Sequence, residues 1–90
     1  MATVCKHVLY AGHVQGVGFR YTTQGLAAGY AVAGHVRNLP GGEVELVVEG
    51  EAEVVEAFLA AVAQRMAGYI TKTTVVETAA TGQRGFHIRH

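Results

Sequence analysis

The chain has 90 residues, of which 50% are apolar and 16% are charged, and this is enough for one domain with a single hydrophobic core. Its formal net charge is zero, which argues against a dedicated nucleic-acid-binding protein, because such proteins gather phosphates with a basic stripe. One cysteine, Cys5, excludes an internal disulfide, and the chain has neither a signal-peptide pattern nor an apolar run of membrane-spanning length. We therefore expect a single domain over residues 1–90 in the cytoplasm, with no membrane partner.

The first third of the chain predicts a strand, a turn and a helix. Residues 6–14 alternate well enough for a strand, with Val8 and Tyr10 on one face. From residue 19 to residue 28 the apolar spacing changes to three and four, which predicts a helix with one buried stripe that includes Phe19. Gly29 is well placed to end that helix in a left-handed conformation.

A hairpin is predicted next. Residues 31–39 are typical of a strand, and the Pro40-Gly41-Gly42 sequence favours a tight reversal, because proline presets φ and the glycines allow the turn. Residues 43–49 alternate as the second strand, on which valine and leucine face inward. The side chains expected to face water on this strand are Glu43, Glu45 and Glu49.

Residues 51–67 show the three- and four-residue spacing of a long helix, with Gly68 as its expected end. A strand rich in β-branched residues is predicted over 69–78, a polar loop over 79–85, and a short last strand over 86–89. The order is β-α-β-β-α-β with an additional short C-terminal strand. It predicts an α+β fold, the ferredoxin-like sandwich, in which two helices cover one face of an antiparallel sheet.

The stretch Val14-Gln15-Gly16-Val17-Gly18-Phe19-Arg20 is distinctive because two glycines one residue apart precede an arginine at a predicted helix start. Glycine adopts positive φ without a Cβ penalty, so the backbone can curl and point several N–H groups at one spot. A helix N-terminus attracts anions, and a guanidinium matches two oxygens of a phosphate or a carboxylate. The stretch therefore predicts an anion cradle, best suited to a phosphoryl group. The alternative is a tight strand-to-helix turn with a surface arginine.

The residue types absent from the sequence restrict the chemistry. There is no serine and no aspartate, which excludes a serine nucleophile and an aspartyl-phosphate intermediate. Cys5 lies far from the glycine-rich stretch, and the P-loop pattern and a magnesium-binding carboxylate cluster are missing. The five histidines are scattered without a paired ligand spacing, which favours structural or surface roles. We expect no covalent intermediate, no metal and no cofactor.

The glycine-rich stretch, followed by Gly34-His35-Val36-Arg37-Asn38, resembles the acylphosphatase family, and the resemblance extends over nearly the whole chain to Phe86-His87-Ile88-Arg89. It implies a metal-free hydrolase that splits acyl phosphates into a carboxylate and inorganic phosphate. The family's phosphate-binding arginine falls on Arg20, and its water-positioning asparagine falls on Asn38. The loop amides that wrap the phosphate in the family fall on Gln15, Gly16, Val17, Gly18 and Phe19.

This chemistry needs little from the protein, because an acyl phosphate already has a good leaving group, a carboxylate. The protein must hold the phosphoryl group, neutralise its charge and place a water in line. The amide of Asn38 can hold a water but cannot take its proton. We therefore expect a phosphate oxygen of the substrate to accept that proton, and inorganic phosphate to act as product and competitive ligand.

Two other functions stay open at this point. The first is a non-catalytic anion-binding module of the same fold, similar to the acylphosphatase-like domain of larger carbamoyl-transfer maturation proteins. An end of the chain at His90 favours a free-standing enzyme over this module, and we also expect a monomer. The second is a ferredoxin-like RNA-binding module, which ranks last because its aromatic signature is missing. We therefore expect no nucleic-acid partner.

A separate expectation concerns Arg37 in the Val36-Arg37-Asn38 run, whose side chain we expect to be solvated.

Overall fold

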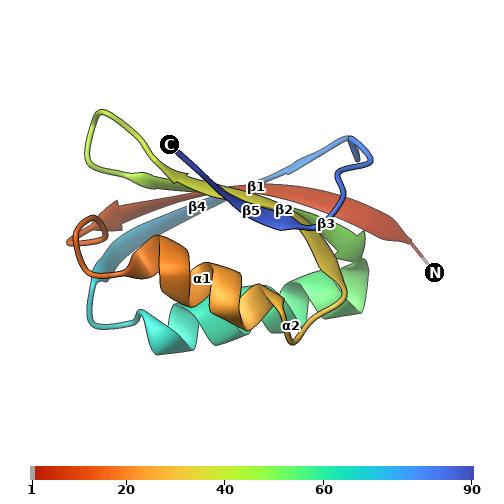
Figure 1. Ribbon diagram of the computed structural model, residues 1–90, viewed down its shortest axis with the longest axis horizontal. Coiled ribbons are helices and arrows are strands. Elements are labelled where there is room, and N and C mark those ends of the chain that lie inside the picture. The colour runs from red at the N-terminus through yellow and green to blue at the C-terminus, as the bar shows by residue number, and fades with distance from the viewer. Residues whose placement is uncertain (1) are drawn as a thin grey trace.

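A computed structural model describes residues 2–90, which form five strands and two helices in the predicted order (Figure 1). Most element bounds lie close to their predicted positions, although the first strand begins at Thr3 rather than Lys6. The elements are β1 (Thr3–Gly12), α1 (Phe19–Ala27), β2 (Val32–Asn38), β3 (Val44–Glu51), α2 (Ala52–Arg65), β4 (Ile70–Thr78) and β5 (Phe86–Arg89).

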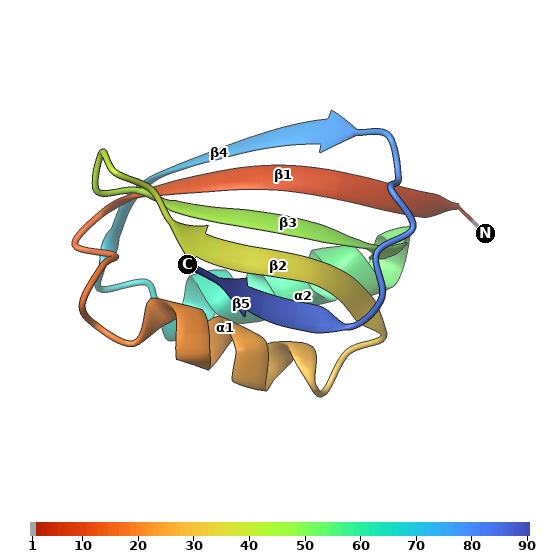
Figure 2. The ribbon, with the colours of Figure 1, turned by 45° about the horizontal axis from the view of Figure 1, so that its top comes forward.

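The strands form one sheet in the order β4-β1-β3-β2-β5, and both helices pack on the same face of it (Figures 1 and 2). This arrangement confirms the ferredoxin-like fold and the short additional strand. The first four strands pair antiparallel, as predicted, whereas β5 pairs parallel with β2 and makes the sheet mixed. The parallel pairing arises because residues 79–85 connect β4, at one edge of the sheet, to β5 at the opposite edge.

The hydrophobic core lies between the sheet and the two helices. Alternate residues of β1 and β3 point toward the helices, and the three- and four-residue stripe of α2 points back at the sheet. Each of these side chains contributes about 1.5–3 kcal/mol when it is fully removed from water. The fully buried members are led by Tyr10, Phe19, Phe58, Leu46, Val8, Val48, Val55 and Val62.

Two glutamates of β3 are covered, so the prediction that they face water is wrong. Glu49 is only 6% exposed, because the connection over residues 79–85 crosses the open face of the sheet above it. The carboxylate of Glu49 accepts hydrogen bonds from the backbone N–H groups of Thr81, at 2.8 Å, and Gln83. These bonds hold the pKa of Glu49 below its ordinary value of 4.5, although burial opposes the shift.

Glu45 is covered by neighbours on the adjacent strands, and its side chain is 12% exposed. Nε2 of His7 donates to it at 2.8 Å, and Nε of Arg37 donates at 2.6 Å. Burial alone would raise the pKa of Glu45, but the hydrogen bonds from His7 and Arg37 outweigh burial and lower it. Arg37, which was expected to be solvated, is half-exposed and belongs to this ion-pair cluster.

The prediction for Gly29 is also wrong, because Gly29 is not among the glycines with positive φ. Helix α1 ends instead at Ala28, a right-handed cap residue, and the amide of Gly29 bonds to the carbonyl of Leu26 at 3.0 Å. A short-range turn therefore satisfies the helix end without the left-handed conformation.

Within residues 2–90, no helix is long and apolar enough to cross a membrane.

Candidate functional site

The glycine loop, residues 13–18, connects β1 to α1 and has the curled backbone that the sequence predicts. Gly16 and Gly18 both adopt φ of 78°, in the left-handed region. A Cβ atom added at either position would meet no other atom within 4 Å, so the backbone angle, rather than crowding, requires glycine there. The open space around these two residues is available to a ligand.

Helix α1 begins directly after this loop, at Phe19. Its cap residue is Gly18, which offers no side chain to the helix amides, and the first turn contains no acidic residue. The first helical hydrogen bond runs from the amide of Thr22 to the carbonyl of Gly18, at 2.9 Å. The backbone N–H groups before Thr22 therefore make no hydrogen bond within the helix. Together with the helix dipole, these N–H groups favour a bound anion.

Phe19 fixes the start of the helix against the sheet. Its ring lies 5.0 Å from the ring of Tyr10 on β1, measured between centroids, and both side chains are buried. Burial raises the pKa of the Tyr10 hydroxyl above its ordinary value, so this group stays protonated. The apolar contact anchors the helix end and the loop that precedes it.

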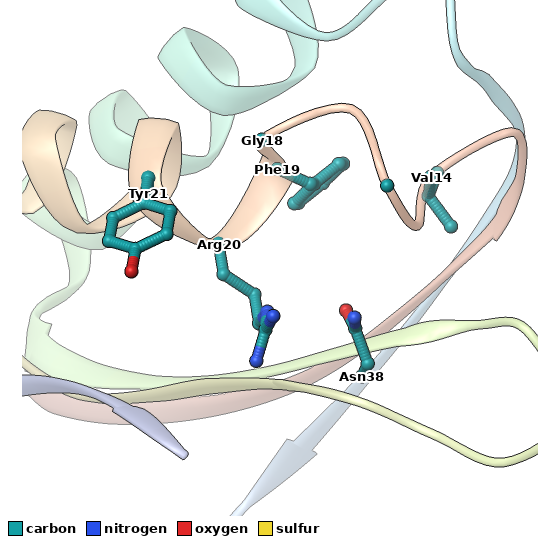
Figure 3. A pocket seen from close by; sticks show the side chains of 7 residues that line it. Val14, Gly18, Phe19, Arg20, Tyr21 and Asn38 are labelled. Carbon is teal, nitrogen blue, oxygen red and sulfur yellow. The ribbon is translucent and has the colours of Figure 1, made fainter. Parts of the chain in front are cut away.

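A pocket of about 260 Å³ lies between the glycine loop, the start of α1 and the end of β2 (Figure 3). In Figure 3 the side chain of Arg20 extends from α1 toward β2, and the amide of Asn38 rises from β2 into the same space. The fold therefore brings together the two residues that the sequence predicts as central. The pocket is lined by Val14, Gly16, Gly18, Phe19, Arg20, Tyr21 and Asn38.

Two predicted loop residues, Gln15 and Val17, do not line the pocket. The side-chain amide of Gln15 donates to the carbonyls of Leu39, at 2.7 Å, and Glu43, at 2.8 Å. Gln15 thus ties the glycine loop to the β2–β3 turn next to Asn38. The side chain of Val17 is 36% exposed.

Sequence reasoning missed two residues near Arg20. Nη1 of Arg20 lies 3.2 Å from Nδ1 of His90, which can accept its hydrogen bond when the ring is neutral. This contact depends on the parallel course of β5 beside β2, for which the sequence contained no signal. Tyr21 lines the pocket, and its position directly after Arg20 could have suggested this.

Within residues 2–90, no three histidine, cysteine or glutamate side chains are placed to hold a metal ion.

The sequence matches the family model described as Acylphosphatase over residues 6–88. The chain belongs to the acylphosphatase family. Its match to an acylphosphatase of Methanothrix thermoacetophila is 51% identical over 57 residues, covering 63% of this chain and 63% of that relative. The matched part is therefore slightly less than two thirds of that relative's length.

Solved structures agree with this family assignment. The acylphosphatase of Bacillus subtilis superposes with a TM-score of 0.87 at 31% identity, covering 97% of this chain and 99% of that one. Full-length HypF, solved in a phosphate- and nucleotide-bound form, has a TM-score of 0.82 at 25% identity. That match covers 99% of this chain but 12% of HypF. The acylphosphatase fold thus occurs both as nearly a whole chain and as a small part of a larger protein.

The assignment confirms the acylphosphatase resemblance inferred from the glycine-rich stretch. The relatives' names also agree with the predicted enzyme class, a hydrolase of acyl phosphates. The individual roles of Arg20, Asn38 and the loop amides stay predictions. The pocket adds the finding that Arg20, Asn38 and part of the glycine loop lie close together.

Proposed function

We propose that this acylphosphatase-family chain hydrolyses acyl phosphates to a carboxylate and inorganic phosphate. One observation supports this most strongly: the glycine loop, the open N-terminus of α1, Arg20 and Asn38 all border one pocket. Such a pocket offers preorganised donors for a phosphoryl group together with a neutral amide for a water. These are the two requirements of a reaction whose leaving group is already good.

The phosphoryl group is held by charge and by amides. We expect the backbone N–H groups of residues 15–19, of which Gly16, Gly18 and Phe19 line the pocket, to donate to its oxygens. The guanidinium of Arg20 binds two of these oxygens through its fork. His90 contacts Arg20 in the free protein and so holds the guanidinium at the pocket. In the transition state the charge spreads over the equatorial oxygens, where these donors stabilise it without reorganisation.

Asn38 places the nucleophile. Its amide oxygen accepts a hydrogen bond from the water, and its amide nitrogen donates to a phosphoryl oxygen. The water oxygen forms a bond to phosphorus while the bond between phosphorus and the carboxylate oxygen breaks. The leaving carboxylate keeps the electron pair, and the proton of the water passes to a phosphoryl oxygen. The products are the carboxylate and inorganic phosphate, which competes for the same pocket.

The setting of this activity is part of the proposal. We expect a cytoplasmic monomer that acts on a small-molecule acyl phosphate, without a cofactor, a nucleic-acid partner or a membrane partner. A second candidate is a non-catalytic anion-binding module, which the similarity to a small part of HypF favours. The two functions share the phosphoryl cradle and differ in whether a water attacks the bound group.

The test is hydrolysis of benzoyl phosphate in excess chelator, with inhibition by inorganic phosphate measured in parallel. Arg20→Ala should lose phosphate inhibition together with activity, by about 100-fold or more, because the main charge of the cradle is removed. Asn38→Ala should lose turnover to a similar degree and keep most of its phosphate affinity. Arg65→Ala and Gln64→Ala, exposed changes on α2, serve as matched controls and should behave as the native chain.

Two outcomes would redirect the proposal. If Asn38→Ala lost phosphate affinity and turnover equally, Asn38 would act mainly by binding the phosphoryl group rather than by positioning the water. If the folded native chain bound phosphate but hydrolysed no acyl phosphate, the accessory module would be the better function.

A further inference from the structure

We propose that Tyr21 is the residue that selects the acyl group, and that the preferred substrates carry a flat, uncharged, aromatic acyl group. This inference rests on the proposed function, because it concerns the part of the substrate that lies outside the phosphoryl cradle. It names a substrate class that neither the glycine-rich motif nor the family assignment supplies.

The exposure of Tyr21 is the first observation. Its side chain is 72% exposed, the highest value among the exposed large hydrophobic residues within 2–90. The ring therefore adds little to the hydrophobic core, and the fold does not require an aromatic residue there. Yet Tyr21 lines the same pocket as Arg20 and Asn38. An exposed aromatic ring beside an anion cradle offers a face on which a ligand can stack.

The second argument is the direction of in-line attack, which follows from the proposed role of Asn38. A water held by Asn38 approaches phosphorus from the β2 side, so the leaving carboxylate must depart from the opposite side. Figure 3 shows Tyr21 and Asn38 on opposite sides of the Arg20 side chain. Tyr21 is the one exposed aromatic residue of the lining, and it lies on the side of the pocket away from Asn38, where the acyl group attached to the leaving oxygen can reach it.

The charge of the pocket lining is the third observation. Arg20 is the one charged residue among those that line the pocket, and the phosphoryl group occupies its guanidinium. The lining provides no second cation for an acyl group that bears a carboxylate or another phosphate. Val14 and Phe19 are buried, so the exposed ring of Tyr21 is the apolar surface of this lining that an acyl group can reach, and a flat, uncharged acyl group matches it best.

The test compares two substrates that share the phosphoryl group, benzoyl phosphate and acetyl phosphate. Tyr21→Ala should lower kcat/KM for benzoyl phosphate by roughly 2- to 10-fold through KM, the range expected for one lost aromatic contact. The value for acetyl phosphate should change less than about twofold, because its methyl group reaches little of the ring. Tyr21→Phe should keep the native preference, because it retains the ring. Tyr69→Ala, another exposed tyrosine outside the pocket, is the matched control.

Inhibition by inorganic phosphate separates the two ends of the substrate, and it should be unchanged in both Tyr21 variants. Equal losses on the two substrates, or weaker phosphate inhibition in Tyr21→Ala, would overturn the proposal, because Tyr21 would then act on the phosphoryl end. An unchanged substrate preference in Tyr21→Ala would overturn it as well.

A binding experiment distinguishes failure of this proposal from failure of the proposed function. Phenacylphosphonate and acetonylphosphonate replace the scissile oxygen with a methylene group and cannot be hydrolysed. By calorimetry, the native chain should bind the phenacyl compound more tightly, and Tyr21→Ala should abolish the difference. This result without turnover would refute the hydrolase alone, whereas turnover without this difference would refute the role of Tyr21 alone.

Discussion

Gln15 shows how one side chain can support a site that it does not enter. Its amide reaches two carbonyls on either side of the β2–β3 turn, those of Leu39 and Glu43, and so joins the loop to the strand end that holds Asn38. Gly16 and Gly18, which follow it in the loop, make the backbone adaptable, and adaptability weakens preorganisation. The two hydrogen bonds of Gln15 offset that flexibility by fixing the distance between the cradle and Asn38.

We therefore expect Gln15→Met, which keeps the length of the side chain but removes both donors, to lower kcat/KM for benzoyl phosphate by about 10-fold. The free energy of unfolding should fall by about 1–2 kcal/mol, since two part-buried bonds are lost. Activity and urea unfolding measure the two effects, with Gln64→Met on the exposed face of α2 as the control. Unchanged activity in a destabilised variant would show that Gln15 serves the fold alone.

Helix α1 contains one polar group that its packing leaves unsatisfied. Thr23 is completely buried, and its hydroxyl has no hydrogen-bond partner within residues 2–90. The side chain lies on the same buried stripe as Phe19 and Ala27, which face the sheet. The helix thus tolerates an unfavourable hydroxyl in its apolar contact, and this cost is independent of the pocket at its N-terminus.

Thr23→Val keeps the shape of the side chain and removes the unsatisfied hydroxyl. We expect it to raise the free energy of unfolding by about 1 kcal/mol, which a higher urea midpoint at an unchanged m-value would reveal. Thr22→Val, one residue earlier and less buried, should change the midpoint little. A clear loss of stability in Thr23→Val would mean that the hydroxyl is satisfied by a water or by a carbonyl of the preceding turn.

At the scale of the whole molecule, Glu49 on the central strand β3 binds the connection between the two edge strands of the sheet. The connection between the edge strands β4 and β5 passes over the open face, and the Glu49 carboxylate holds its middle through Thr81 and Gln83. The position of β5 beside β2, and with it the contact between His90 and Arg20, follows from this crossing. The buried carboxylate of Glu49 thereby stabilises the position of β5 beside β2, next to the pocket.

This arrangement predicts a pH dependence of stability. The hydrogen bond from the Thr81 amide is the largest cause of the lowered pKa of Glu49 in the folded chain. Its stabilisation is therefore fully present above the ordinary value of 4.5 and is lost as the pH falls through the folded-state pKa. Glu49→Gln should be less stable than the native chain by about 1–3 kcal/mol at pH 7, because the charged acceptor is removed.

The difference between the native chain and Glu49→Gln should narrow as the pH falls below 4.5. Urea unfolding at a series of pH values measures it, with Glu56→Gln, an exposed change on α2, as the control. A difference that stayed constant down to low pH would show that charge is not the cause, and that the variant is destabilised by its packing.

The features that could be predicted from the sequence are those set by neighbours a few residues apart. Apolar spacing, β-branched residues and turn residues located both helices and all five strands. The spacing of Gly16, Gly18 and Arg20 predicted an anion cradle where the structure has a pocket. Backbone preferences and side-chain spacing act locally, so they can be read along the chain. The family resemblance added Asn38, whose place opposite Arg20 depends on the pairing of distant strands.

The features that could not be predicted depend on which distant segments meet. The parallel pairing of β5, the covering of Glu49 and the contact of His90 with Arg20 all follow from a connection that crosses the sheet. Glu45 is covered instead by His7 and Arg37 on the adjacent strands. Burial and hydrogen bonding of a polar group are set by its neighbours in space, and alternation along one strand cannot supply them. Tyr21 depends on both kinds of information: its place after Arg20 is visible in the sequence, but its position in the lining of the pocket follows from the packing of α1 beside β2.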